Sequence, residues 1–258
     1  MGFVGKVSKG SVFNQIYIPK NLRWEFEAGS LVEVKLLEKR LHYSRKFAIS
    51  EFKEKLIKEI FSFLESFGVK QIIIAGSFLK EKIDYRDIDL LLVVDRRGEK
   101  FENVVYKKLI EKLNLKFHLL FFDEESFIKL QESCPLTRSM LYYSISNKKI
   151  EKRGRKIDEN HIKFLLMMPE DLLKIKVNTR VFYDSLRRLV AIEKFLSSKE
   201  EDPSEINKDL KDELGVLYKE IRDNEIIEEA GIVRLRKIIQ NKILKIRKMI
   251  KYGQEKSL

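Results

Sequence analysis

Two aspartates, Asp87 and Asp89, stand at the start of an apolar run that extends to Val94. In a strand the side chains alternate between faces, so both carboxylates would lie on one face while Ile88 and Leu90 point to the other. A pair of carboxylates on one face is a hard-oxygen site of the kind that binds Mg²⁺. The spacing therefore predicts a divalent-metal site at the entrance of a buried strand.

A Gly-Ser pair precedes these aspartates. Gly76 and Ser77 follow a second apolar run at 69–75, and nine residues separate Ser77 from Asp87. Glycine lets the backbone come close to a ligand, and amides at the start of a helical turn point toward phosphate oxygens. A metal held by the aspartates would then grip the β- and γ-phosphates of a nucleotide and activate an attacking oxygen. The plainer interpretation is a polar turn whose aspartates only cap strand or helix ends.

The elements around these residues indicate an α/β layer. A helix is expected between Ser50, a good N-cap, and Gly68, a good stop, because apolar side chains recur at helical spacing between them. Strands are expected at 69–75, 88–94 and 116–122, and a further helix at 99–113. The order helix, strand, strand, helix, strand is typical of an α/β sheet.

The regions before and after this layer differ from it. Residues 1–45 carry two alternating runs typical of strands, at 12–18 and 31–36, with a short helix expected at 19–26 between them. From Asp158 onward only helices are expected, at 171–196, 203–222 and 228–252, which predicts a bundle. The expected fold class is α+β or mixed, with a small N-terminal β-hairpin domain at 1–45, an α/β domain at 46–157 and a helical domain at 158–258.

With its Gly-Ser pair, nine-residue spacer and Asp-x-Asp between two apolar strands, the stretch from about Ser50 to Ile150 resembles the nucleotidyltransferase superfamily of DNA polymerase β. It is most similar to the minimal and the aminoglycoside nucleotidyltransferases. The resemblance implies that Gly76 and Ser77 bind the triphosphate of an NTP such as ATP. It also implies that Asp87 and Asp89 bind two metal ions, Mg²⁺ or Mn²⁺.

The stretch departs from that family at a third position. Active members carry a third carboxylate on a later strand, which helps to hold the metal and acts as a base toward the acceptor hydroxyl. The matching strand here is KFHLLFF, on which Lys116 and His118 share a face and neither is acidic. Three explanations stay open. His118 is a metal ligand or base, or one of the later acids Asp123, Glu124 and Glu125 swings in, or the domain binds nucleotide without efficient transfer.

The N-terminal region resembles a second family. The run QIYIPK at 15–20, then Leu22-Arg23, then GSLVEV at 29–34 are similar to the swapped-hairpin DNA-binding domains of the AbrB, SpoVT and MazE type. That resemblance implies an intertwined homodimer through residues 1–45 and, for many members, DNA binding through basic residues. The stretch between Arg23 and Gly29 is about two residues shorter than in that family. A hairpin that only dimerises the chain or packs on the enzyme domain is the alternative.

The net charge and the composition indicate which partners the protein could bind and which kind of organism its composition resembles. The net charge of +12 favours a polyanionic partner such as DNA, RNA, nucleotide or anionic lipid, or else a Lys-rich solvated surface. The helix expected near 232–252 is basic on one face, which fits a solvated bundle helix or a nucleic-acid surface. Charged residues make up 36% of the chain, with Lys, Glu and Ile prominent, a mix typical of proteins from hyperthermophiles.

The single Cys134 excludes an internal disulfide and a multi-cysteine zinc site, and it favours the cytoplasm. No signal peptide and no membrane-spanning helix are expected, because no apolar run approaches about 18 residues.

Two functions follow from these observations. The first is a Mg²⁺-dependent nucleotidyltransferase that moves an NMP from an NTP to a hydroxyl of a protein, an RNA or a small molecule and releases pyrophosphate. By analogy such an enzyme would fit a toxin–antitoxin system. Its C-terminal helices would help to form the acceptor site, with Arg180, Arg187 and Arg188 as lining residues. The alternative is a dimeric DNA-binding regulator whose catalytic domain is degenerate.

Overall fold

The computed structural model describes residues 3–22, 24–27, 29–35, 39–81, 85–95, 98–175 and 179–255. The chain divides into two compact units, Met1–Lys39 and Arg40–Leu258. The division falls before residue 45, where the sequence places it, because His42 and Tyr43 form a strand of the sheet in the second unit. The α/β layer and the helical bundle, expected as separate domains, belong to this one unit.

The first unit is a short hairpin. Strand β1 (Val7–Lys9) pairs antiparallel with β2 (Asn14–Ile16), and a 3₁₀ turn, η1 (Lys20–Leu22), follows. The expected strand at 12–18 is therefore shorter, and the expected helix at 19–26 is reduced to η1. The strand expected at 31–36 does not form in residues 31–35, and Leu36 lies outside the described residues. Among the described residues of this unit only β1 and β2 pair, and a two-stranded sheet is marginally stable by itself.

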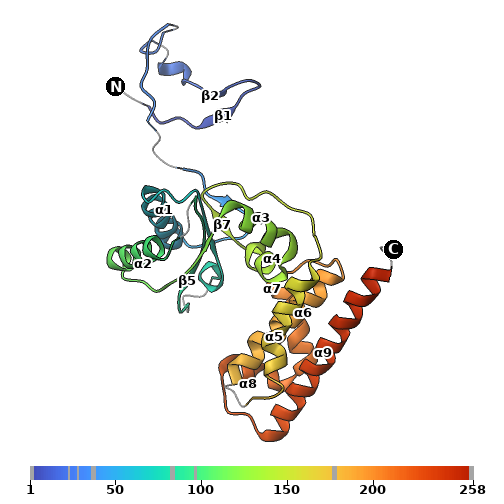
Figure 1. The fold of residues 1–258 in the computed structure, drawn as a ribbon. Coiled ribbons are helices and arrows are strands. Elements are labelled where there is room, and N and C mark those ends of the chain that lie inside the picture. The colour runs from blue at the N-terminus through green and yellow to red at the C-terminus, as the bar shows by residue number, and fades with distance from the viewer. Residues whose placement is uncertain are drawn as a thin grey trace. The chain divides into compact units, whose positions relative to one another are not determined.

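The second unit is built on a mixed sheet with the order β3-β7-β4-β5-β6 (Figure 1). Its strands are β3 (His42–Tyr43), β4 (Gln71–Ala75), β5 (Ile88–Val93), β6 (Phe117–Phe122) and β7 (Ile145–Ser146). Strand β4 runs antiparallel to both β5 and β7, whereas β5 and β6 are parallel. The two-residue strands β3 and β7 were not expected from the sequence, because such short runs carry no periodicity.

Helices α1 (Glu51–Ser66) and α2 (Glu99–Leu113) cover one face of the sheet. The Ser50 side chain accepts a hydrogen bond from the Lys53 amide, and Gly68 has a φ of 77°, which confirms the predicted start and stop of α1. The core between this face and the helices includes fully buried side chains from both layers: Ile57, Ile60, Leu64, Ile72, Ile74, Ile88, Leu90 and Leu92.

Helices α3 (Glu124–Ser133) and α4 (Pro135–Tyr142) lie on the other face (Figure 1). Their apolar side chains, Phe127 among them, pack on Ile73, Leu91 and Val93. Strands β4 and β5 are thus covered on both sides, which explains why their sequences are almost continuously apolar. Neither helix was expected from the sequence.

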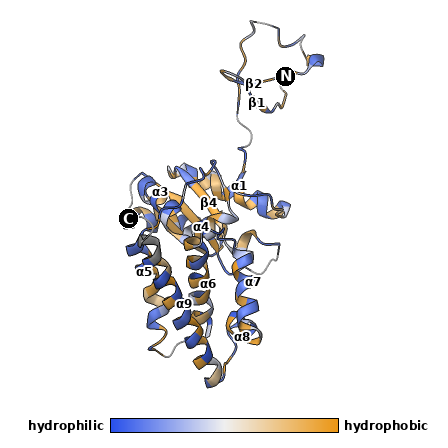
Figure 2. Cartoon of the chain, turned by 90° about the vertical axis from the view of Figure 1, so that its right-hand side faces the viewer, coloured by the Kyte–Doolittle hydropathy of each residue, from blue (hydrophilic) through white to orange (hydrophobic). Residues whose placement is uncertain are grey.

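The remaining helices form a bundle that packs on α4. They are α5 (Glu159–Asp171), α6 (Thr179–Leu196), α7 (Pro203–Leu214), α8 (Val216–Asp223) and α9 (Glu229–Glu255). Helix α6 contacts the other four as well as α4. The single helix expected at 203–222 is divided at Gly215, whose φ of 59° ends α7. Figure 2 shows hydrophobic strands at the centre of the sheet and hydrophilic outer faces on the helices.

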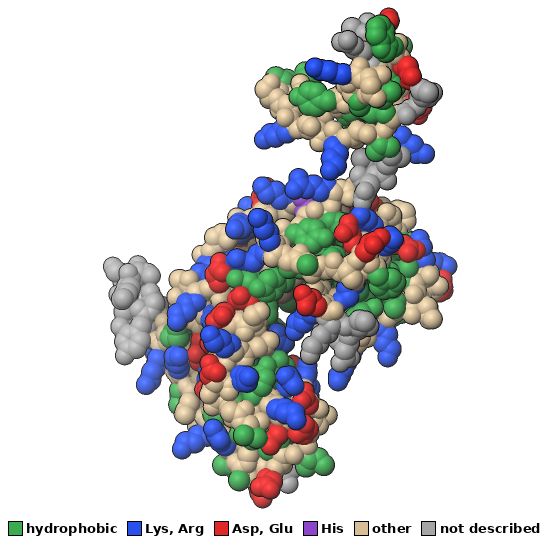
Figure 3. All heavy atoms as spheres, turned by 180° about the vertical axis from the view of Figure 1, so that it is seen from behind, with side chains coloured by type: hydrophobic (Ala, Val, Ile, Leu, Met, Phe, Trp, Pro, Cys, Tyr) green, Lys and Arg blue, Asp and Glu red, His purple; other side chains and the backbone are tan. Residues whose placement is uncertain are grey.

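Several basic side chains of α9 are engaged within the bundle. Arg247 pairs with Glu170 at 2.7 Å, Lys242 with Glu213 at 2.8 Å, and Lys245 with Glu193 at 3.1 Å. These pairs support the structural interpretation of that helix over a nucleic-acid surface. Figure 3 likewise shows Lys and Arg spread among acidic side chains over this face of the second unit. In the described ranges, no helix is both long and apolar enough to cross a bilayer.

Candidate functional site

Gly76 and Asp89 come together where β4 ends and β5 begins. Ala75 and Asp89 are direct partners across the antiparallel pair, so Gly76 leaves the sheet beside the Asp89 side chain. The φ of Gly76 is 81°, a conformation that favours glycine. A Cβ atom on Gly76 would lie 2.9 Å from Cγ of Asp89 and closer still to a carboxylate oxygen. The glycine is therefore needed for the carboxylate to rest against the turn.

The turn after Gly76 is a short 3₁₀ helix, η2 (Ser77–Leu79). Phe78 and Leu79 are buried and anchor it in the core, while Gly76 is exposed and Ser77 is half-buried. The Ser77 hydroxyl makes no hydrogen bond with any other described residue, so it is available to a ligand. The turn thus presents a glycine and a free hydroxyl to solvent on a rigid base.

Asp87 and Asp89 are both half-buried, with the fully buried Ile88 between them. Burial raises the pKa of Asp89, the hydrogen bond with His118 lowers it, and the charge of Asp87 raises it again. The negative charge of Asp87 thus adds to the rise in the pKa of Asp89, and a cation bound beside Asp89 would offset it.

His118 lies directly opposite Asp89 in the parallel pair of β5 and β6. Its Nδ1 is 3.0 Å from Oδ1 of Asp89, and its side chain is 57% exposed. This is the place beside the aspartate pair where the resemblance implies a third carboxylate.

The acids that follow β6 are at the other end of that strand. Asp123 is five positions beyond His118 in the chain, which is about 16 Å in an extended strand. The Asp123 carboxylate also accepts hydrogen bonds from the amide of Ser126 at 2.7 Å and from its hydroxyl at 2.9 Å, and so caps α3. Glu124 and Glu125 lie in the first turn of that helix. The structure therefore gives no support to an acid from this group swinging into the site.

Lys53 was not identified from the sequence as a site residue. It projects from the first turn of α1, is buried, and donates a hydrogen bond from Nζ to the carbonyl of Lys80 at 2.5 Å. Its ammonium group also lies 5.4 Å from the ring centre of Phe78 and 5.7 Å from that of Tyr85. Burial lowers the pKa of Lys53. Helix α1 thereby holds the end of the Gly-Ser turn, and the only sequence signal for this was a lysine on the apolar side of a helix.

The three arginines predicted to line an acceptor site each contact a group of the helical bundle. Arg180 donates to the carbonyl of Arg222 at 2.6 Å, and Arg188 donates to that of Leu165 at 3.3 Å. The guanidinium of Arg187 lies 5.6 Å from the ring centre of Tyr183. All three are thus engaged with groups of the helical bundle.

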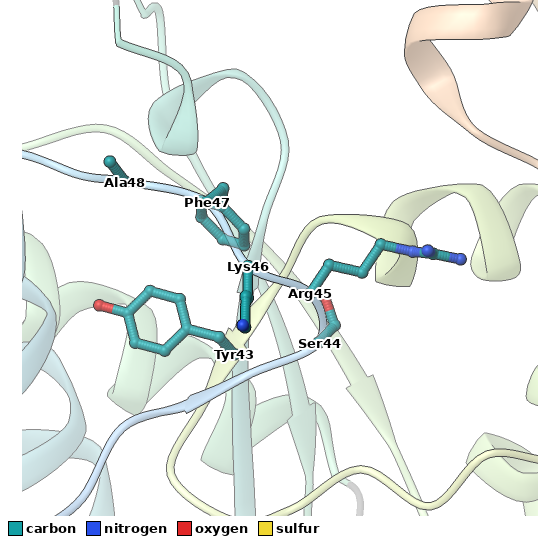
Figure 4. Close-up of a pocket in the computed structure, with 6 residues that line it drawn as sticks. All are labelled: Tyr43, Ser44, Arg45, Lys46, Phe47 and Ala48. Carbon is teal, nitrogen blue, oxygen red and sulfur yellow. The ribbon is translucent and has the colours of Figure 1, made fainter.

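An open pocket of about 720 Å³ lies at the end of β3, lined by residues 43–48 (Figure 4). The ring centres of Tyr43 and Phe47 are 5.4 Å apart. Lys46 makes no ion pair with any residue that the structure describes. Arg45 points away from Tyr43 and binds Glu200 at 2.7 Å.

This pocket and Gly76 lie at the same end of the sheet strands. Strands β3 and β4 both run antiparallel to β7, so their C-terminal ends lie on the same side of the sheet. Their ends are about 10 Å apart, because neighbouring strands are about 4.8 Å apart. The pocket is therefore a recess close enough to hold a second substrate.

A divalent ion at this site would need ligands from substrate or water in addition to those from the protein. In the part of the chain that the structure describes, no group of three or more His, Cys, Asp or Glu side chains could hold a metal ion by itself. Mg²⁺ is usually held by one or two carboxylates together with substrate phosphates and water, so an aspartate pair beside an exposed turn fits this mode of binding.

Comparison with known proteins adds no assignment. No protein-family model matches the chain, and no curated protein matches its sequence. The function must therefore be argued from the geometry of the site.

Proposed function

We propose that this protein is a metal-dependent nucleotidyltransferase with a catalytic layer of the DNA polymerase β type. The observation that carries the proposal is the contact between the Asp89 carboxylate and Gly76, with Asp87 and His118 beside it. An acidic pair against an exposed glycine turn suits a ligand that combines a cation with phosphates.

In the proposed reaction an acceptor hydroxyl attacks the α-phosphorus of an NTP. The new bond joins the acceptor oxygen to that phosphorus, pyrophosphate leaves, and one proton is released. The Gly76–Ser77 turn holds the phosphates through its backbone amides and the Ser77 hydroxyl. Asp87 and Asp89 would hold Mg²⁺ or Mn²⁺, which supplies neutralisation of phosphate charge and activation of the attacking oxygen. His118 holds the Asp89 carboxylate in place through their hydrogen bond.

The acceptor is proposed to occupy the pocket at residues 43–48. The aromatic pair of Tyr43 and Phe47 offers a surface for stacking, and Lys46 offers a cation without a partner among the described residues. These groups suit an acceptor with a flat ring and negative charge, such as the end of an RNA. A protein or a small molecule remains an outcome of the test below.

The direct test is transfer of label from each α-labelled NTP with Mg²⁺ or Mn²⁺, using RNA, cell protein and small hydroxyl compounds as acceptors. The wild type should transfer label, and Asp87→Asn and Asp89→Asn should lose at least ~100-fold of the rate, the scale on which removal of one electrostatic contact acts. Asp95→Asn is the matched control, because this exposed aspartate lies just past the far end of β5. No transfer by the wild type with any NTP, or equal transfer by Asp89→Asn, would contradict the proposal.

A second candidate function rests on the N-terminal unit. Its exposed apolar side chains include Val12, Phe13, Tyr17, Trp24, Leu31 and Val34. We propose that this unit forms a homodimer that buries them, and that the dimer binds DNA, as the AbrB-type resemblance implies. This function is compatible with transferase activity, with a degenerate catalytic layer, with a toxin–antitoxin role and with a cytoplasmic location.

Sedimentation and gel-shift experiments test the second function. The full chain should sediment as a dimer and bind DNA with an affinity that falls steeply with salt. Removing residues 1–39 should abolish both properties. Lys9→Glu combined with Lys20→Glu in the full chain should weaken DNA binding and leave the dimer intact. A monomeric wild type or salt-independent binding would exclude this function.

A further inference from the structure

A segment of basic side chains between β7 and α5 leads to a further inference about the partner of this protein. We propose that residues 148–156, called here the basic strip, bind the phosphate backbone of a single-stranded nucleic acid while aromatic rings nearby stack on its bases. The inference rests on the proposed function in one respect, because it makes this strand the acceptor whose end enters the pocket at residues 43–48.

The first argument is the charge of the basic strip. Its nine residues include six basic side chains and one acidic side chain. Glu151 pairs with Arg153 at 2.8 Å, and the buried Glu201 pairs with Arg155 at 3.0 Å. The other basic side chains are exposed and make no ion pair or hydrogen bond with any residue that the structure describes: Lys148, Lys149, Lys152 and Lys156. These four lysines are therefore available to an anion.

The second argument is that the basic strip is held in place although it forms no helix or strand. The Lys156 amide donates to the carbonyl of Glu132 on α3 at 2.9 Å. The guanidinium of Arg138 on α4 donates to the carbonyl of Arg153 at 3.3 Å. Figure 1 shows the segment running past α3 and α4 on its way from β7 to α5. A surface that is already ordered loses less conformational entropy when it binds a flexible chain.

The third argument is a row of aromatic rings. Four side chains follow one another with ring centres 5.0–5.8 Å apart, and each is exposed or partly exposed: Tyr43, Phe47, Tyr143 and Tyr142. The Arg45 guanidinium lies 4.0 Å from the ring centre of Tyr142. Rings together with cations are the groups by which proteins bind single strands, because bases stack on the rings and phosphates attract the cations.

Glu200 shows that the basic strip passes close to this aromatic row. Its carboxylate binds Arg45 and the Tyr142 hydroxyl, each at 2.7 Å. These two hydrogen bonds lower the pKa of Glu200, and the nearby charge of Lys152 lowers it further. Lys152 therefore lies in the neighbourhood of the rings, and one bound strand can reach both surfaces.

The start of the basic strip lies near the edge strand β3. Burial lowers the pKa of His42 on this strand, and the charges of Arg40 and then Lys149 lower it further. Both cations are thus close to one imidazole at the edge of the sheet. Positive charge therefore continues from the basic strip to the strand that leads into the pocket.

The combination of lysines and rings favours a single strand over other polyanions. An acidic protein would satisfy the lysines but would bring no row of flat groups to the aromatic side chains. In a duplex the bases already stack on one another, whereas the unstacked bases of a single strand can stack on aromatic side chains. A single strand is therefore the partner that uses both surfaces.

The test is fluorescence anisotropy of the full chain with a labelled oligouridylate of about 12 nucleotides, without metal or NTP. Lys149→Glu combined with Lys152→Glu should lose ~10-fold or more of the affinity. The slope of log affinity against log salt should fall by about 1.4, since each phosphate contact on a single strand contributes about 0.7. Equal thermal unfolding of variant and wild type checks that the fold is kept.

The matched control is Lys100→Glu combined with Lys107→Glu. These exposed lysines lie on α2, which covers the other face of the sheet, and the change in net charge is the same. The control pair should bind the oligouridylate like the wild type. Lys9→Glu combined with Lys20→Glu, the pair that tests DNA binding by the N-terminal unit, should also bind it like the wild type.

Stacking has a separate readout. Tyr43→Ala should lose ~5-fold or more of the affinity with no change in the salt slope, because a ring contributes no charge. An abasic strand of the same length should bind the wild type ~5-fold or more weakly than the oligouridylate. Polyglutamate of the same charge should compete only at concentrations ~10-fold or more higher.

The outcomes separate this inference from the function on which it rests. If the variant with Lys149→Glu and Lys152→Glu binds like the control pair, the inference is overturned, and label transfer to another acceptor would leave the proposed function standing. If that variant loses binding while the wild type transfers no label, the binding surface stands and the proposed function is overturned. Equal affinity for the abasic strand, or equal competition by polyglutamate, would overturn the assignment to a single-stranded nucleic acid.

Discussion

Single residues decide whether this site can exist. Gly76 is the clearest case, because the Asp89 carboxylate occupies the space that any side chain at this position would need. His118 is the second, since its ring fills a place where an acidic side chain would leave another negative charge beside Asp89. The Asp89 carboxylate thus restricts which residue types can stand at positions 76 and 118.

Replacing Gly76 by alanine should damage both the fold and the site. A non-glycine residue at a φ of 81° costs about 1–3 kcal/mol, and the new methyl group would collide with the Asp89 carboxylate. We expect a lower free energy of unfolding and loss of nucleotide binding, measured by urea denaturation and by titration with an ATP analogue. Gly98→Ala is the control, because a Cβ there would meet no atom within 4 Å. Equal behaviour of the two variants would refute this account of Gly76.

Replacing Lys53 by methionine should disturb the Gly-Ser turn more than it lowers the free energy of unfolding. The change leaves the Lys80 carbonyl without its ammonium donor, a loss of about 1–3 kcal/mol that burial of the methionine partly offsets. We expect KM for the NTP to rise several-fold because the end of the Gly-Ser turn is no longer held. The control is Lys55→Met, at an exposed position on the same helix. An unchanged KM would show that Lys53 has no positioning role.

At the scale of elements, the groups that the proposed function uses lie at one end of the sheet strands. The ends of β3 and β4 and the starts of β5 and β6 lie there, together with the N-terminus of α1. The Gly76–Ser77 turn, the aspartate pair, His118 and the pocket therefore lie at the same end of the sheet strands. No single element carries more than a part of this set.

Substitutions in the pocket at this end of the sheet should change KM for the acceptor and leave KM for the NTP unchanged. Tyr43→Ala removes a stacking ring from its lining, and Lys46→Ala removes a cation that has no ion-pair partner among the described residues. Because stacking of one base contributes about 1–3 kcal/mol, Tyr43→Ala should raise KM for an RNA acceptor at least ~5-fold. KM for the NTP should stay the same, and Tyr106→Ala on α2, an exposed tyrosine, should change neither. A rise in KM for the NTP alone would assign the pocket to the nucleotide instead.

At the scale of the whole molecule, ion pairs tie the sheet layer to the bundle. Glu200 lies between α6 and α7 and accepts hydrogen bonds from Tyr142 of α4 and from Arg45, each at 2.7 Å. Glu201 is buried and binds Arg138 and Arg155 at 3.3 Å and 3.0 Å. These contacts add to the apolar packing of α4 against the bundle within the compact unit of residues 40–258.

The Glu200 contacts predict a dependence of stability on pH. The Tyr142 hydroxyl, and next the Arg45 guanidinium, hold the pKa of Glu200 below its usual value of 4.5. The folded state therefore binds this proton less readily than the unfolded state. The stabilisation is complete above pH 4.5 and is lost as the pH falls through the lowered pKa.

Thermal unfolding from pH 3 to pH 7 tests this prediction. Glu200→Gln should be less stable than the wild type at pH 7 by about 0.2–1 kcal/mol, a small value because the side chain is largely exposed. The difference should shrink as the pH falls below 4.5. Glu228→Gln, at an exposed position, should show no such trend. A difference that stays constant with pH would contradict the assignment.

Much of the sheet layer followed from the sequence alone. The Ser50 cap and Gly68 stop define α1, the apolar alternation around Asp87 and Asp89 places β5, and the mixed α/β class follows from the order of elements. These are local signals, since a cap, a stop or an alternation depends only on neighbouring residues.

Only the tertiary structure decided which residues meet. The register of β5 against β6 places His118 beside Asp89, α1 brings Lys53 to Lys80, and the pairing of β3 with β7 puts the pocket at the same end of the sheet as Gly76. Contacts of this kind join segments far apart in the chain, and their energies come from packing and pairing that no local pattern encodes. The run at 31–35 alternates as a strand would, yet it pairs with no strand of the described residues, because alternation by itself does not supply a partner.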